Sequence, residues 1–138
     1  MARGQLIGVD ANVLVRLFVP GDDDGQHAAA RAFFAARHAG DPAYISAIVL
    51  AEAIWLLRGQ FGYAGEAVED LIRKILSSGD FVVEHGDRLS ALLGADASSR
   101  PQIADHLISW SAEVAGCTHT VTFERRAAKH LPGMELLA

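Results

Sequence analysis

The sequence predicts an α/β fold of three layers, α/β/α, in which helices cover both faces of a short, mostly parallel central sheet. Short apolar segments alternate with longer segments of helical periodicity, which is the pattern of successive βαβ units. A length of 138 residues fits one domain and is enough to bury a core. Apolar residue types make up 51% of the chain, which excludes intrinsic disorder. We therefore expect residues 1–138 to form a single domain.

The expected strands are short apolar runs that end at turns or polar residues. Residues 6–9 form an uninterrupted apolar run before Asp10, which predicts a strand buried on both faces. Three further strands are predicted, at residues 43–45, 81–83 and 120–123. A last segment, residues 134–137, follows a turn at residues 131–133.

The expected helices lie where apolar residues recur at helical spacing. They are residues 11–19, 26–38, 47–58, 66–77, 88–95, 103–115 and 125–130. Pro20 and Gly21 end the first helix, and Gly116 follows the sixth at the position that favours glycine. Ser46 and Asp87 are the expected N-caps of the third and fifth helices. A turn is expected at residues 22–25 and a loop at residues 98–101.

The charge balance and the single cysteine exclude several classes of protein. The chain has 12 Lys and Arg against 17 Asp and Glu, a net charge of −5. This excludes nucleic-acid binding through a broad basic face, but not phosphate binding through a metal ion. Cys117 is the only cysteine, so there is no intrachain disulfide framework and no cysteine-based zinc finger.

The hydrophobic segments predict no membrane span and no signal peptide. No segment reaches about 18 uninterrupted apolar residues, and the chain reaches Asp10 too soon for a signal peptide. We therefore expect a soluble protein of the cytoplasm. The surplus of apolar residues predicts that part of the surface binds a partner or a second copy of the chain.

Four acidic residues stand at positions where function usually lies or where a solvated acid is not expected. Asp10 and Glu124 directly follow predicted strands, and Asp105 lies in the first turn of the helix at residues 103–115. Glu52 is the only charged residue between Ala47 and Leu57. A carboxylate in such an apolar stretch is predicted to be buried and to need a partner or a metal ion.

Each of these acids also has an ordinary structural interpretation. Asp10 and Glu124 can be N-caps of the helices that follow them, and the helix dipole favours Asp105 in a first turn. Glu52 can lie on a narrow exposed stripe of its helix. These alternatives stay open for each residue taken singly, and capping does not exclude metal binding.

Together the four acids predict a metal site. Parallel strands end at one edge of a sheet, so we expect the acids to converge on one crevice there. Two carboxylates ~5 Å apart repel each other by roughly 3 kcal/mol at an effective dielectric of about 20. The lysines, Lys74 and Lys129, are not beside these strand ends, which leaves a divalent cation as the natural neutraliser. Oxygen ligands favour Mg²⁺ or Mn²⁺ over Zn²⁺, and the predicted chemistry is metal-dependent phosphodiester hydrolysis.

A resemblance to a known family rests on four short segments in order. They are residues 9–16, 51–57, 104–108 and, for the last, 115–117 with 120–125. These segments resemble the motifs of the PIN-domain ribonucleases, most closely the VapC-type toxins of bacterial toxin–antitoxin pairs. The resemblance spans nearly the whole chain and implies a PIN-like fold. It further implies a Mg²⁺-dependent endoribonuclease of a type II toxin–antitoxin module, with an RNA substrate, a cognate antitoxin and a toxin homodimer.

The resemblance also assigns roles to individual residues. Asp10 and Asp105 would be the main metal ligands. Glu52 would complete the acidic catalytic site, as a direct ligand or through water. Asn12 and Thr122 would orient the carboxylates by hydrogen bonds.

Two positions depart from the family pattern. Glu124 stands where the family usually has Asp, and Gln102 stands where it often has another acid. Four arginines could guide RNA phosphates or form a solvated surface: Arg16, Arg58, Arg125 and Arg126. We expect His106 to be a neighbour of the site rather than a base, and we expect Trp55 and Trp110 to lie in the core.

Three other interpretations compete with the nuclease. A phosphatase of the haloacid-dehalogenase type needs a second Asp where this chain has Asn12, and it needs a lysine that this chain lacks at the right place. A response-regulator receiver needs paired acids after the first strand and a lysine after the last. A non-catalytic PIN-like module that binds RNA or protein stays open, because Glu124 departs from the family pattern.

Overall fold

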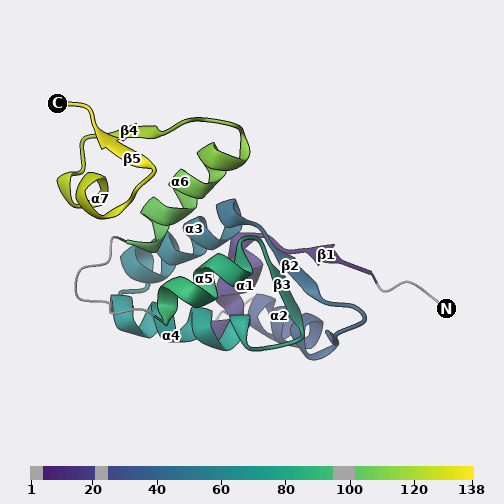
Figure 1. The fold of residues 1–138 in the computed structure, drawn as a ribbon. Coiled ribbons are helices and arrows are strands. Elements are labelled where there is room, and N and C mark those ends of the chain that lie inside the picture. Colours follow the sequence, from purple (N-terminus) through teal and green to yellow (C-terminus); the bar gives the residue numbers. More distant parts are fainter. Residues whose placement is uncertain (1–4, 21–24, 95–101) are drawn as a thin grey trace. The chain divides into compact units, whose positions relative to one another are not determined.

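The computed structural model (Figure 1) describes residues 5–20, 25–94 and 102–138. Residues 22–24 of the turn predicted at 22–25, and the loop predicted at residues 98–101, lie outside these ranges. The chain divides into two compact units, Met1–Leu93 and Gly94–Ala138, and each has its own short parallel sheet. The predicted α/β class with mostly parallel strands is confirmed.

The first unit contains a three-stranded parallel sheet of order β1-β2-β3. Its strands are β1 (Ile7–Gly8), β2 (Ala43–Ile45) and β3 (Phe81–Val83), with Ile7 opposite Ala43 and Ala43 opposite Phe81. The predicted bounds of β2 and β3 are confirmed. The predicted burial of β1 is wrong, because Ile7 is half-buried and Gly8 is exposed in a strand that forms one end of the strand order.

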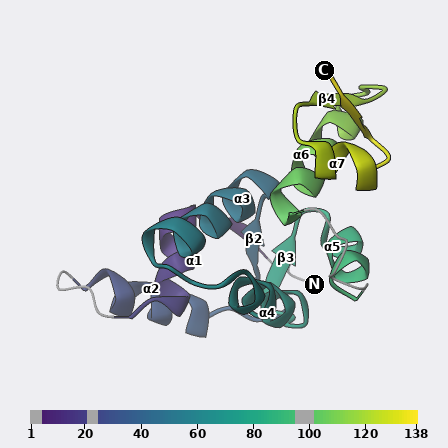
Figure 2. The same cartoon turned by 90° about the vertical axis from the view of Figure 1, so that its left-hand side faces the viewer.

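Helices lie on both sides of this sheet, and their bounds follow from the local sequence. Figure 2 shows the sheet between α1 (Ala11–Phe18) and α2 (Gln26–Ala35) on one side and α5 (Gly86–Leu93) on the other. The helix α4 (Gly65–Leu76) packs against α5 and β3 through its predicted apolar face. That face is buried at Val68, Ile72 and Ile75.

The helix α3 (Ala47–Trp55) follows β2 and begins where the sequence predicted. The Oγ atom of Ser46 accepts a hydrogen bond from the Val49 N–H at 3.1 Å, so the predicted N-cap is confirmed. Beyond Trp55 the chain widens into a π-helical turn, Leu56–Gln60, instead of continuing as an α-helix to residue 58. In contrast, Asp87 lies inside the first turn of α5 and is not its N-cap, because that helix already begins at Gly86.

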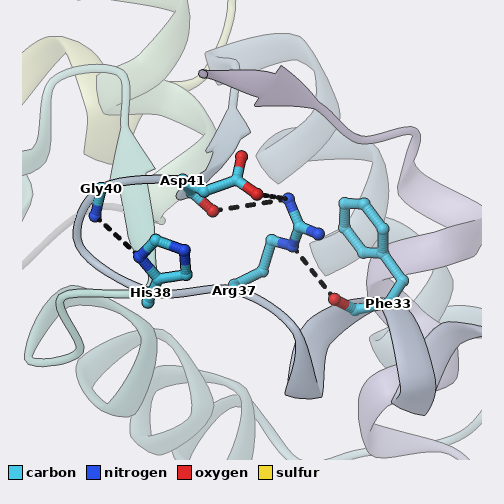
Figure 3. Close-up of polar contacts among 5 residues, drawn as sticks. All are labelled: Phe33, Arg37, His38, Gly40 and Asp41. Carbon is cyan, nitrogen blue, oxygen red and sulfur yellow. Dashed lines mark hydrogen bonds and ion pairs between the residues drawn. The ribbon is translucent and has the colours of Figure 1, made fainter. Parts of the chain in front are cut away.

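The connection from α2 to β2 is fixed by a nearly buried arginine (Figure 3). The Arg37 side chain is 9% exposed, and its guanidinium forms an ion pair with Asp41 at 3.1 Å. Its Nε–H also donates to the Phe33 carbonyl at 3.0 Å, and its Cζ atom lies 4.2 Å from the Phe33 ring centroid. The helix α2 ends at Ala35, three residues before the predicted end.

The second unit begins its described part with a helix and contains a βαβ unit. Its elements are α6 (Ile103–Val114), β4 (Thr120–Thr122), α7 (Arg125–His130) and β5 (Met134–Leu136). The strands β4 and β5 are parallel, with Thr120 opposite Met134. Gly116 has a φ of +93°, which confirms the predicted glycine after α6. A buried cluster links α7 to β5 and consists of Ala127, Leu131 and Met134.

The two tryptophans lie in different environments. Trp110 is 8% exposed and contacts the buried His106, with ring centroids 5.5 Å apart. Trp55 is 71% exposed at the end of α3, so the prediction that it lies in the core is wrong. Within the described ranges, no helix has the length and apolar character needed to cross a membrane.

Candidate active site

Two of the predicted acids lie together in the second unit. Asp105, in the first turn of α6, and Glu124, directly after β4, line one cavity of about 440 Å³. The other described residues that line it are Gln102, Ala104 and Arg126. The fold therefore places a helix start and a strand end at one pocket, as expected for the functional edge of a βαβ unit.

Local hydrogen bonds hold Glu124 in place. The Glu124 N–H donates to Thr122 Oγ1 at 3.0 Å, and the Glu124 carboxylate accepts a hydrogen bond from the Arg126 N–H at 3.3 Å. Glu124 is thus the N-cap of α7, as its structural interpretation predicted. Thr122 fixes the backbone of Glu124, which is a positioning role one step removed from the carboxylate itself.

The surroundings of Asp105 disfavour the ionised form of its carboxyl group. Burial, which removes water from the charged form, is the main cause that raises the pKa of Asp105, and the negative charge of Glu124 raises it further. A backbone hydrogen bond at Gln102 opposes these effects in part. The ionised form of Asp105 is therefore disfavoured, and a bound cation would offset this effect.

The donor chemistry of this pair fits a hard divalent ion. Mg²⁺ in proteins is commonly held by one or two carboxylates and keeps several waters, and this pocket supplies two carboxylates and open volume. Over residues 5–20, 25–94 and 102–138, no group of three or more His, Cys, Asp or Glu side chains is arranged to hold a metal ion. Asp105 and Glu124 thus form a two-carboxylate candidate site within their own unit.

The first predicted acid lies in the other unit, beside a different cavity. Asp10, Asn12 and Arg16 line a cavity of about 480 Å³ between β1, α1 and α2. Asp10 is exposed, and its Oδ1 atom accepts a hydrogen bond from the Ala11 N–H at 2.7 Å. It is therefore the N-cap of α1, a role that leaves its second carboxylate oxygen for a ligand.

Glu52 also belongs to the first unit, and its predicted burial is wrong. Its side chain is exposed on α3, on the same face as Ile48 and Trp55, which are 81% and 71% exposed. The prediction assumed that apolar neighbours in the sequence indicate burial. Two of these neighbours, Ile48 and Trp55, are themselves on the exposed face of the helix. The alternative interpretation, that Glu52 lies on an exposed stripe of its helix, is therefore confirmed.

Sequence reasoning missed a second acid at a strand end of the first unit. Glu84 directly follows β3, and its carboxylate accepts a hydrogen bond from the Ala47 N–H at 2.7 Å. It thus fixes the first residue of α3, the helix that carries Glu52. After burial, the charge of Glu84 is the second cause that raises the pKa of Tyr44. Its position after a strand was a signal of the same kind that singled out Asp10.

Comparison with known families agrees with the fold. A family model described as PIN domain matches residues 7–131, so the chain belongs to the PIN domain family. The match extends over residues of both units. PIN domains are generally metal-dependent nucleases, which supports a nuclease at this level. No curated protein and no solved structure gave a significant match.

Proposed function

We propose that this PIN domain is a Mg²⁺-dependent endoribonuclease that hydrolyses RNA phosphodiester bonds and acts as the toxin of a type II toxin–antitoxin module. The observation that carries the proposal is the pairing of Asp105 with Glu124 in one cavity, with the pKa of Asp105 raised by burial and by its partner. Two neighbouring carboxylates, one of them partly buried, destabilise the folded protein when both are ionised, unless a cation binds between them.

The acids of the second unit have roles in the proposed site. Asp105 is its principal metal ligand, and Glu124 binds the same ion directly or through water. A divalent ion bound by this pair would activate water and neutralise charge on the phosphate, and Mn²⁺ has the same ligand preference as Mg²⁺. The catalytic roles of Asp10 and Glu52, both in the first unit, stay predictions from the sequence resemblance. Asn12, which lines the cavity beside Asp10, would orient that carboxylate.

The toxin assignment adds protein partners and a cellular location to the proposal. Large apolar side chains are exposed on α3 and α6, among them Ile48, Trp55 and Val114. Such surfaces support binding to an antitoxin or to a second copy of the chain. An antitoxin that controls an RNA-cleaving toxin would act on it in the cytoplasm.

The proposal is tested by RNA cleavage with purified protein. We expect cleavage of structured RNA with Mg²⁺ or Mn²⁺ and none in excess chelator. Asp105→Asn should reduce cleavage by at least about a hundredfold, in line with the loss of a metal ligand. Glu113→Gln on the same helix α6 is the matched control, because Glu113 is not among the described residues that line the acid cavity. Equal cleavage by both variants would contradict the proposed site.

The toxin role is tested separately in bacteria. Induced wild-type protein should arrest growth, Asp105→Asn should not, and mapping of RNA ends should show new cuts only with the wild type. Co-expression of the antitoxin should restore growth. If wild type and Asp105→Asn arrest growth equally, or neither does, the toxin assignment fails.

A second candidate function is a non-catalytic PIN-like module that binds RNA or protein. Two observations favour it: the Glu124 carboxylate already caps α7, and Glu52 is exposed and does not line the described cavity beside Asp10. RNA binding without cleavage under any of Mg²⁺, Mn²⁺ and Co²⁺ would support this module over the nuclease.

A further inference from the structure

The acid cavity of the second unit also contains a positive charge. Arg126 is the one basic side chain among the described residues that line this cavity. It is the second residue of α7, and its backbone N–H donates to the Glu124 carboxylate at 3.3 Å. Arg125 precedes it in the same helix, is likewise exposed, and does not belong to the described lining. The structure thus distinguishes two adjacent arginines that the sequence alone treated alike.

The charges of the pocket change sign when a divalent ion binds. With both acids ionised and Arg126 protonated, the three side chains carry one net negative charge, which repels a phosphodiester. A divalent ion would convert this to one net positive charge, which matches the single negative charge of one phosphodiester. The pocket is therefore expected to bind RNA phosphate only after it has bound the ion.

We propose that Arg126 binds a non-bridging oxygen of the RNA phosphate beside the Asp105–Glu124 metal site and so positions the substrate. This inference rests on the proposed nuclease function and adds a substrate-binding residue to it. The planar guanidinium can donate two parallel hydrogen bonds to a phosphate, a geometry that an ammonium group cannot supply. Arg126 would therefore act on substrate binding and orientation, while the acids hold the ion.

A competing role for Arg126 makes an opposite prediction. If Arg126 only compensates the charge of the two acids, its removal should tighten binding of the divalent ion and leave RNA affinity unchanged. If it binds phosphate, its removal should weaken RNA binding in the presence of the ion. The two roles are therefore separated by measuring metal affinity and RNA affinity on the same variants.

The experiment compares Arg126→Gln, Arg126→Lys and the control Arg125→Gln with the wild type. The first measurement is Mn²⁺ affinity by calorimetry. The second is fluorescence anisotropy of a labelled RNA, with Ca²⁺ in place of Mg²⁺ to slow hydrolysis, over a range of salt. We expect Arg126→Gln to weaken RNA binding about tenfold. The slope of log affinity against log salt concentration should become shallower by about one, as expected for the loss of one phosphate contact. Arg126→Lys should recover part of this loss, and Arg125→Gln should bind within about twofold of the wild type.

The outcomes separate this inference from the proposed function. If the wild type cleaves RNA and Arg126→Gln binds and cleaves it like the wild type, the role of Arg126 is overturned and the nuclease stands. The same conclusion follows if Arg125→Gln loses as much RNA affinity as Arg126→Gln. If the wild type neither binds nor cleaves RNA with a divalent ion present, both proposals are overturned.

Discussion

Asp105 and Glu124 line the same cavity from two different elements, α6 and the end of β4, and the negative charge of Glu124 adds to burial in raising the pKa of Asp105. Two short elements of one βαβ-containing unit are enough to create this coupling. A positive charge that enters the cavity would stabilise the ionised form of Asp105, which burial and Glu124 disfavour.

The first prediction concerns the pH dependence of metal binding. A proton on Asp105 competes with the ion, so Mn²⁺ affinity should increase as pH rises through the raised pKa of Asp105 and then level off. Glu124→Gln removes the negative charge that raises this pKa, so the rise in affinity should move to lower pH. Calorimetric titrations with Mn²⁺ across a pH series measure both effects. A Mn²⁺ affinity that stays constant from acidic to neutral pH would contradict the coupling.

The second prediction concerns stability without metal. The folded-state pKa of Asp105 is raised, so the favourable contribution of its protonated form is complete below its unfolded value of 3.8. This contribution is lost as pH rises through the folded-state pKa, and at neutral pH the ionised Asp105 destabilises the fold. Asp105→Asn should therefore raise Tm at neutral pH by up to about 4 °C in chelator. The gain should shrink in acid.

Magnesium provides the internal control for this stability effect. Added Mg²⁺ should raise the Tm of the wild type more than that of Asp105→Asn, because the variant lacks the carboxylate that binds the ion. Glu113→Gln, on the same helix, should respond to Mg²⁺ like the wild type. A lower Tm for Asp105→Asn at neutral pH in chelator would show that the ionised carboxylate stabilises the fold instead.

The local elements of the fold were predictable because short-range contacts determine them. The bounds of β2, β3 and α7 match the prediction, as does the Ser46 N-cap of α3. In each case the signal and its partner lie within a few residues, so the sequence pattern contains the whole interaction. The same holds for Glu124, whose capping role depends on its neighbour two residues along the chain.

Burial and long-range roles were less predictable. The helix α3 has apolar residues on nearly all sides, so no polar face marked the outward position of Glu52 and Trp55. The role of Glu84 depends on Ala47, which is 37 positions away, and only the parallel pairing of β2 with β3 brings them together. The pairing of Asp105 with Glu124 could be inferred, because both the strand end and the helix start had clear sequence signals.

The third prediction compares a nearly buried arginine with an exposed one. Arg37 is 9% exposed and pairs with Asp41, whose Oδ1 atom is already buried without a hydrogen-bond partner. Arg37→Met should destabilise the fold by about 3 kcal/mol, because it leaves the Asp41 charge uncompensated. Arg73 is 44% exposed and forms ion pairs with Glu69 and Asp70. Because solvent screens these pairs, Arg73→Met should lower the free energy of unfolding by less than about 1 kcal/mol. Urea unfolding of both variants measures the difference, and equal losses would contradict it.

The last prediction concerns the close approach of Gly133, the residue before β5, to α6. A Cβ atom on Gly133 would lie 2.5 Å from Ser109 Oγ, a separation that requires something to shift. Ser109 is only 6% exposed, so its side chain has little room to turn away. Gly133→Ala should therefore destabilise the second unit by about 1–3 kcal/mol.

The same geometry predicts a specific rescue of Gly133→Ala. The Cβ atom of Ser109 lies 3.9 Å from the position that the new methyl group would take, which is ordinary van der Waals contact. Ser109→Ala removes only the crowded hydroxyl, so the double variant should recover most of the stability lost by Gly133→Ala. Ser111→Ala, on the same helix but exposed, is the matched control and should give no recovery. If both serine substitutions restore stability equally, or neither does, the clash between Gly133 and Ser109 does not determine the spacing of β5 and α6.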